Sequence, residues 1–134
     1  VHNRNVYFLD PVPKGELAEL YSVSSMGSSF VIPVQELWGN SANKYFDSFA
    51  SAKPILINYG GWQAEEIKEK DVGYILPPRI DDINDKVIID FINYTFDTQR
   101  LKNQSQNALK LAQDKYSLHL AVQKYIKVIN RVLK

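Results

Sequence analysis

The chain has 134 residues, of which 45% are hydrophobic, and a formal net charge of +1. This length suits one domain, and the apolar content excludes a wholly disordered chain. The absence of cysteine excludes disulfides and thiolate metal sites, and no apolar run approaches the ~20 residues that a membrane-spanning helix needs. With no signal-peptide pattern at its start, the sequence predicts a cytoplasmic globular domain.

Short apolar runs alternate along the chain with stretches of helical periodicity. The predicted strands are 6–9, 30–32, 55–57 and 73–76. The predicted helices are 16–25, 42–51, 63–70, 82–96 and 98–133, the last with a break near 116–117. Asp81 or Asp82 is expected to cap the helix that begins at 82, and Ser117 the final helix.

Apolar strands that alternate with helices predict an α/β fold with a parallel sheet covered on both faces. Ligands of such folds bind beyond the carboxyl ends of the strands. In this chain those ends are the loops after Leu9, Ile32, Ile57 and Leu76, and three of the four carry Gly, Asn or Asp. We therefore expect the binding site in these loops.

Charge is distributed unevenly along the chain. Residues 1–97 hold 8 Lys/Arg and 14 Asp/Glu, a balance of −6, whereas residues 98–134 hold 8 Lys/Arg and only Asp114, a balance of +7. Such a split indicates that the C-terminal part faces something anionic. Phosphate-bearing lipid head groups and nucleic acid both fit, as does a solvated helix face beside an acidic partner.

The segment 39–44 is the strongest candidate for chemistry. Its residues are Gly39, Asn40, Ser41, Ala42, Asn43 and Lys44. It follows a predicted strand and enters a predicted helix, whose first N–H groups and dipole favour an anion such as a diphosphate. Lys44 adds a positive charge, or is simply a solvated helix lysine.

Asp47 lies one turn after Asn43 on the same helix face. Its carboxylate can accept two hydrogen bonds from a vicinal diol such as a ribose, or it can be a structural acid near a helix start. Gly60-Gly61 permits close backbone approach, and Trp62 either covers a sugar or base or packs on a helix. These two signals are weak.

Other catalytic patterns are missing or weak. His2 and His119 are the only histidines and have no third ligand at metal spacing, so a zinc site is not expected. The acidic residues 65, 66 and 69 are typical of a solvated helix face. No Ser-His-acid set and no Walker-type phosphate loop occur.

The run SSFVIPVQELWGNSANKYFDSFASAKPILINYGGWQAEEIKEKDVGYILPP, and within it NSANKYFDSFASAKPI most specifically, resembles the C-terminal domain of family 4 retaining glycosyltransferases. The similarity is greatest to the bacterial branch that builds capsular and O-antigen polysaccharides. It implies a three-layer Rossmann-like domain, half of a GT-B fold, that spans 1–134. It also implies binding of a nucleotide sugar, with a UDP-sugar the expected donor, and transfer that retains the anomeric configuration without a metal or other cofactor.

The resemblance assigns roles residue by residue. Asp47 stands for the second acid of the family's Glu-x7-Glu pair and would hold the ribose hydroxyls. The first acid falls on Gly39, so contact with the donor sugar passes to backbone, to Asn40 or to Glu36. The amides of Ala42 and Asn43 would hold the diphosphate. The loop at Pro11 and Val12 would face the base, chiefly through its backbone.

The same resemblance implies that the chain begins after the domain's first βα unit and lacks the N-terminal acceptor domain. We therefore expect no complete catalytic set and no transferase activity from this chain alone. The alternatives are a nucleotide-sugar epimerase on the same scaffold and a non-catalytic binding module, for which Gly39 in place of an acid is the main sign.

The final predicted helix carries an apolar stripe from Leu118 to Leu133. If the stripe lacks its partner, it favours self-association, so we expect a homodimer or an exchanged helix. For a glycosyltransferase, the basic C-terminal helices favour peripheral contact with the inner membrane face over nucleic acid.

Overall fold

The sheet of the computed structural model, which describes residues 5–133, has three short parallel strands in the order β1-β2-β3. They are β1 (Gly27–Ser29), β2 (Ile55–Ile57) and β3 (Gly73–Ile75). Gly27 lies opposite Ile55, and Ile55 opposite Gly73. The predicted α/β class with a parallel sheet is therefore confirmed, although the described sheet has three strands rather than four.

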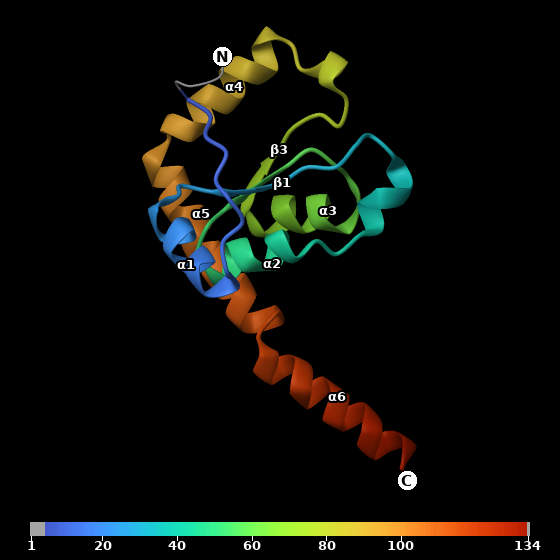
Figure 1. Ribbon diagram of the computed structural model, residues 1–134. Helices are drawn as coiled ribbons and strands as arrows, with labels where there is room; N and C mark the ends of the chain where they lie inside the picture. The colour runs from blue at the N-terminus through green and yellow to red at the C-terminus, as the bar shows by residue number, and fades with distance from the viewer. Residues whose placement is uncertain (1–4, 134) are drawn as a thin grey trace.

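Helices occupy most of the remaining chain (Figure 1). They are α1 (Lys14–Val23), α2 (Asn43–Ala50), α3 (Gly61–Lys70), α4 (Asp85–Phe96), α5 (Thr98–Lys115) and α6 (Leu118–Val132), with short 3-10 turns η1 (Gln35–Gly39) and η2 (Ile80–Asp82). The helices α2 and α3 connect successive strands, and α5 packs against both of them. This order of strands and crossover helices is what a parallel sheet requires.

The core lies where β2 meets α2, α3 and α5. Tyr45, Phe49, Ile55 and Ile57 are fully buried, and Ile67 is nearly so. All three residues of β2 are buried because β2 is the central strand. A continuous apolar strand at this position is typical of a parallel sheet covered by helices.

Two glycines allow the close packing around β2. A side chain at Gly73 would place its Cβ 2.0 Å from the carbonyl oxygen of Ile55, and one at Gly27 would lie 2.5 Å from Ser48 Oγ. Both glycines sit in strands, where glycine is ordinarily unfavourable. Their role here is to let a neighbouring strand and α2 approach.

The first predicted strand is wrong. Residues 6–9 form no strand, and Phe8 is 85% exposed. The second strand lies earlier than predicted, at Gly27–Ser29 instead of 30–32. Its ladder ends there because Val31 exchanges both backbone hydrogen bonds with the side-chain amide of Asn58, at 2.9 Å each, rather than with a strand.

The helix predictions are closer to the structure. The predicted helices 42–51 and 63–70 match α2 and α3 within two residues, and the break at 116–117 is confirmed. Ser117 caps α6 by accepting a hydrogen bond from the Leu120 N–H. The expected cap of α4 by Asp81 or Asp82 is wrong: both lie in η2, and Asn84 accepts the hydrogen bond from the Val87 N–H.

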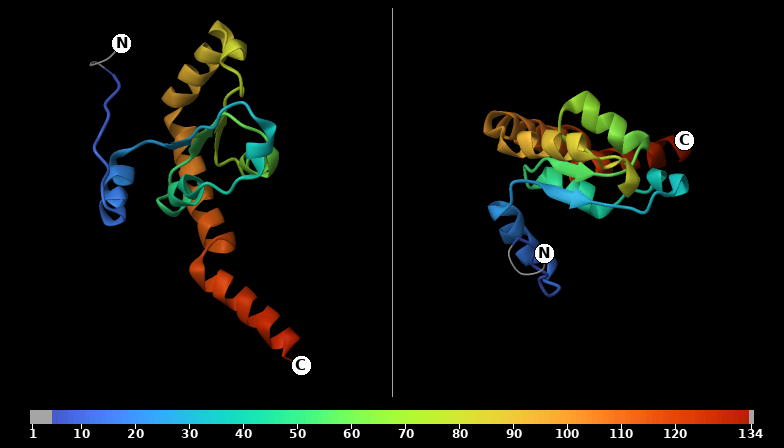
Figure 2. Two further views of the ribbon diagram at one scale, coloured as in Figure 1. Left: turned by 45° about the vertical axis from the view of Figure 1, so that its right-hand side comes forward. Right: turned by 90° about the horizontal axis from the view of Figure 1, so that it is seen from above.

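Two parts of the chain stand away from the sheet and its helices. Helix α6 points away from the rest of the chain in Figure 1 and in the left view of Figure 2, and residues 5–23 lie to one side of the sheet. Neither α1 nor α6 contains a buried residue. Residues 27–116 therefore form the body of the structure, which includes the candidate positions from Gly39 to Asp47.

Candidate nucleotide-binding site

The predicted phosphate segment leads directly into α2. Gly39 ends η1, and Ala42 is the residue that precedes the helix, with extended backbone and no side-chain cap. The first N–H groups of a helix have no partner within it. Asn43 and Lys44, in the first turn of α2, are exposed, so this end of the helix lies at the surface, where an anion has access to it.

Trp38 brings this segment next to the start of α3. A Cβ at Gly60 would lie 2.8 Å from the Trp38 ring, and one at Gly61 2.9 Å from its carbonyl oxygen. Gly61 also has a φ of 77°, which favours glycine. The Gly60-Gly61 pair thus permits Trp38 to lie against it, and the loops after β1 and β2 meet at one edge of the sheet.

Asp47 faces α1 rather than the solvent beyond α2. Its carboxylate lies 4.0 Å from Lys14 Nζ, and its side chain is 35% exposed. Burial raises the pKa of the Tyr21 phenol, and the negative charge of Asp47 raises it further. Lys14 is two residues after the half-buried Val12, so the structure brings Asp47 to the end of the loop predicted to face a base.

Gly39 has space for a side chain. No atom lies within 4 Å of a Cβ built there, and its φ is not in the left-handed region. The fold therefore does not require glycine at this position. Glu36, Asn40 and Ser41 are exposed around it, so polar groups are present near the position of the expected acid.

Asp47 also lines a groove between α2 and the junction of α5 with α6. Phe46, Leu109 and Tyr116 form much of its apolar wall. Trp62 does not line this groove; its ring packs on those of Tyr45 and Phe46, with centroids 5.5 and 6.4 Å away. The interpretation of Trp62 as a packing residue is therefore the one that agrees with the structure.

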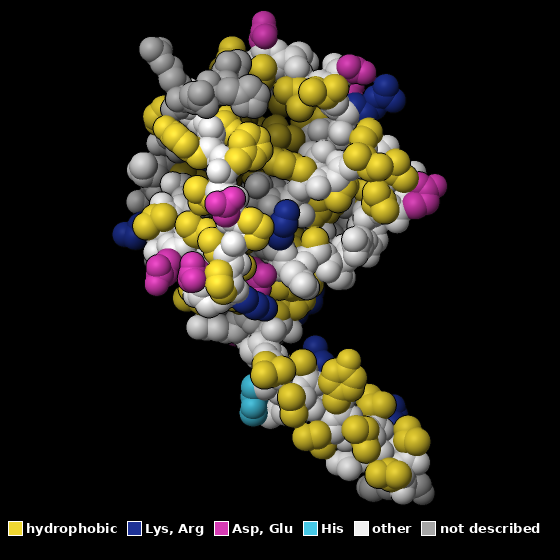
Figure 3. All heavy atoms as spheres, viewed as in Figure 1, with side chains coloured by type: hydrophobic (Ala, Val, Ile, Leu, Met, Phe, Trp, Pro, Cys, Tyr) yellow, Lys and Arg dark blue, Asp and Glu magenta, His cyan; other side chains and the backbone are white. Residues whose placement is uncertain are grey.

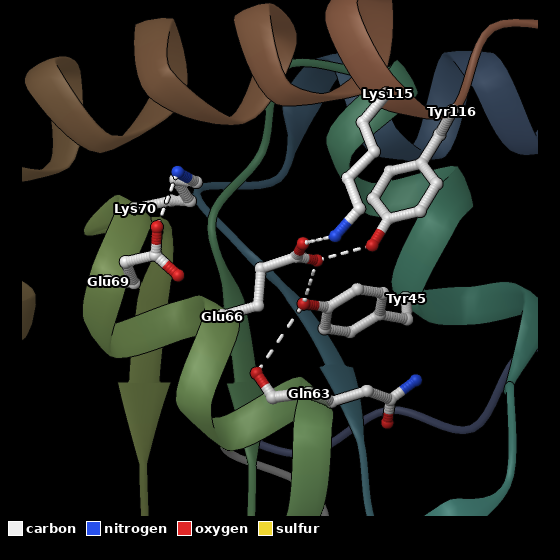
Figure 4. A network of polar contacts seen from close by, with 7 residues as sticks. All are labelled: Tyr45, Gln63, Glu66, Glu69, Lys70, Lys115 and Tyr116. Carbon is white, nitrogen blue, oxygen red and sulfur yellow. Dashed lines mark hydrogen bonds and ion pairs between the residues drawn. The ribbon is translucent and has the colours of Figure 1, made fainter. Parts of the chain in front are cut away.

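The sequence interpretation missed a buried polar network around Glu66 (Figure 4). The prediction of a solvated face is wrong for Glu66, whose side chain is 6% exposed, although it holds for Glu69 at 69%. The Glu66 carboxylate accepts hydrogen bonds from Tyr45 at 2.9 Å and from Tyr116, and forms an ion pair with Lys115. It joins α2, α3 and α5 at one point.

The contacts within this network shift the pKa values of its members. Burial raises the pKa of the Glu66 carboxyl, but the hydrogen bonds from Lys115, Tyr116 and Tyr45 together outweigh burial and lower it. Burial and the Glu66 charge raise the pKa of both tyrosines well above the usual value. All three groups thus keep their ordinary neutral-pH charge, as a structural network should.

A second network joins β3 to α4 and α5. Tyr94 donates to Gln104 Oε1 at 2.6 Å, and the Gln104 amide donates to Asp71 Oδ1 at 2.6 Å. Burial raises the pKa of Tyr94 to about 12. The second amide contact of Gln104, to the Gly73 carbonyl at 3.2 Å, fastens α5 to the sheet edge.

Two buried polar side chains near the start of α3 have atoms without a protein partner. They are the Trp38 indole N–H and both amide atoms of Gln63, which is fully buried. In Figure 4 the Gln63 side chain points away from the Glu66 carboxylate. Buried polar groups normally find partners, and these atoms have none among the described residues.

Among residues 5–133, no helix is long and apolar enough to cross a bilayer, and no group of three or more His, Asp or Glu is placed to hold a metal ion. No protein-family model matches the chain. Comparison with curated proteins and with solved structures also finds no significant match.

Proposed function

We propose that this chain forms the donor-binding part of a retaining glycosyltransferase and that its sheet belongs to one Rossmann-like half of a GT-B fold. The proposal rests on the sequence resemblance. The observation that supports it best is the position of Asp47, whose carboxylate lies 4.0 Å from Lys14 at the start of α1, just after Val12. Those are the two places where the resemblance puts the ribose and the base.

In this proposal the exposed first turn of α2 binds the diphosphate of a nucleotide sugar. The N–H groups at Ala42 and Asn43 donate to phosphate oxygens, and Lys44 balances their charge. Lys44 forms no ion pair with any carboxylate of residues 5–133. Its charge is therefore available to an anion.

Asp47 accepts hydrogen bonds from the ribose hydroxyls. Its ion pair with Lys14 is long, and the Lys14 side chain is 84% exposed, so the pair holds Asp47 only weakly. Replacing this contact with hydrogen bonds from two ribose hydroxyls therefore costs little free energy. The donor sugar then lies toward Gly39 and Asn40, where open space remains.

A uridine diphosphate titration tests the proposal. The wild-type chain is expected to bind, and Asp47→Ala to weaken binding about 10- to 100-fold because charged hydrogen bonds are lost. Glu65→Ala is the matched control, since Glu65 is an exposed acid on α3. Equal affinity of all three proteins, or no binding by wild type, would contradict the proposal; guanosine diphosphate in parallel tests the base.

A further inference from the structure

Helix α6 has a broad apolar face that residues 5–133 leave exposed. Leu118, Val122, Tyr125, Ile129 and Val132 follow one another at spacings of four and three and lie on one side of the helix. Each is between 46% and 79% exposed. Figure 3 shows hydrophobic side chains along the whole length of α6.

All the charged residues on the opposite face of α6 are positive. Lys124, Lys127 and Arg131 are its charged residues, and α6 contains no Asp or Glu. At 3.6 residues per turn these three project away from the apolar face. The helix therefore combines a wide apolar side with a cationic side.

This pattern does not suit pairing with a second copy of α6. In paired helices the positions beside the apolar seam usually carry Glu and Lys, whose opposite charges select the partner. Here those positions hold Ala121, Ile126 and Val128, so the apolar face is wider than a seam.

An anionic lipid surface matches both faces. We propose that α6 is an interfacial helix that lies in the head-group region of an anionic bilayer, with its apolar face toward the acyl chains. Helices of this composition bind in the plane of the membrane. With 15 residues, α6 is about 22 Å long, which is shorter than the ~30 Å hydrocarbon core, so it lies on the bilayer instead of crossing it.

Cosedimentation of the full chain with vesicles tests this proposal. We expect binding to equimolar phosphatidylcholine and phosphatidylglycerol, and much weaker binding to phosphatidylcholine alone. The triple variant Lys124→Gln, Lys127→Gln, Arg131→Gln should lower binding to the anionic vesicles about 100-fold, since each basic residue near the surface contributes about 1 kcal/mol.

A matched control separates the position of the charges from their number. The triple variant Lys86→Gln, Lys102→Gln, Lys110→Gln removes three exposed charges outside α6 and should bind like wild type. If both triple variants bind equally, or if wild type binds neutral vesicles as well as anionic ones, the proposal is wrong.

Tyr125→Asp with Ile129→Asp tests the apolar face, which should be required for vesicle binding. Neither residue is buried, so the far-ultraviolet circular dichroism should remain that of wild type. A wild-type dimer in light scattering that this variant converts to monomer, without any vesicle binding by wild type, would assign the face to a second copy and overturn the proposal.

Discussion

Helices α5 and α6 follow each other in the chain and are both amphipathic, yet only one of them is covered. Helix α5 buries Gln104, Ala108 and Leu111 against α2, α3 and the sheet. Helix α6 contains no buried residue. An apolar stripe thus specifies which side of a helix can be buried. Whether that side is buried depends on the other elements of the fold, or on another surface, that pack against it.

The same substitution in the two helices should give the largest contrast. Leu111 is 7% exposed and Leu118 79%. Leu111→Ala should lower the free energy of unfolding by about 3 kcal/mol through lost burial and a cavity, whereas Leu118→Ala should change it by less than about 0.5 kcal/mol. Urea unfolding followed by circular dichroism measures both. Equal destabilisation would mean that α6 is covered after all.

The second contrast concerns the attachment of α5 through Glu66. Glu66→Ala should cost about 2 kcal/mol, because it breaks the ion pair with the half-exposed Lys115 and the 2.9 Å hydrogen bond from Tyr45. The buried Tyr45 hydroxyl would keep only its long 3.5 Å contact with the Gln63 carbonyl. Glu69→Ala, the control, removes an exposed acid of the same helix and should be nearly neutral. Differential scanning calorimetry compares the two melting temperatures, and a neutral Glu66→Ala would show that the network adds nothing to stability.

The smallest expected effect is on pH dependence. The folded-state pKa of Glu66 is lowered from 4.5, so its contribution to stability is fully present above that pH and is lost as the pH falls through the folded value. Wild type should therefore lose more stability than Glu66→Gln as the pH drops below about 4.5. Urea unfolding across this pH range would refute the linkage if the two curves run parallel.

Some of this architecture can be predicted from local sequence. The helix at 42–51, the strand at 55–57 and the cap at Ser117 depend on periodicity, β-branched residues and a side chain that bonds three residues ahead. The position of Asn43 and Lys44 at the start of α2 follows from the same signals. These features need no information from distant residues.

Other features depended on tertiary partners. The strand predicted at 6–9 has the right residue types, yet the structure assigns no strand to these residues. Gly27–Ser29 has poor strand propensity, yet it pairs with β2 because a small residue lets α2 approach. Propensity favours a conformation, whereas pairing decides whether it forms.

The same distinction applies to function. The order of loops and helices from Gly39 to Asp47 follows from local sequence, since helix starts are set locally. The position of Asp47 beside Lys14, the burial of Glu66 among tyrosines and the exposure of α6 follow instead from how the elements pack. Burial and charge pairing join residues far apart in the chain, and a local pattern contains no information about which of them meet.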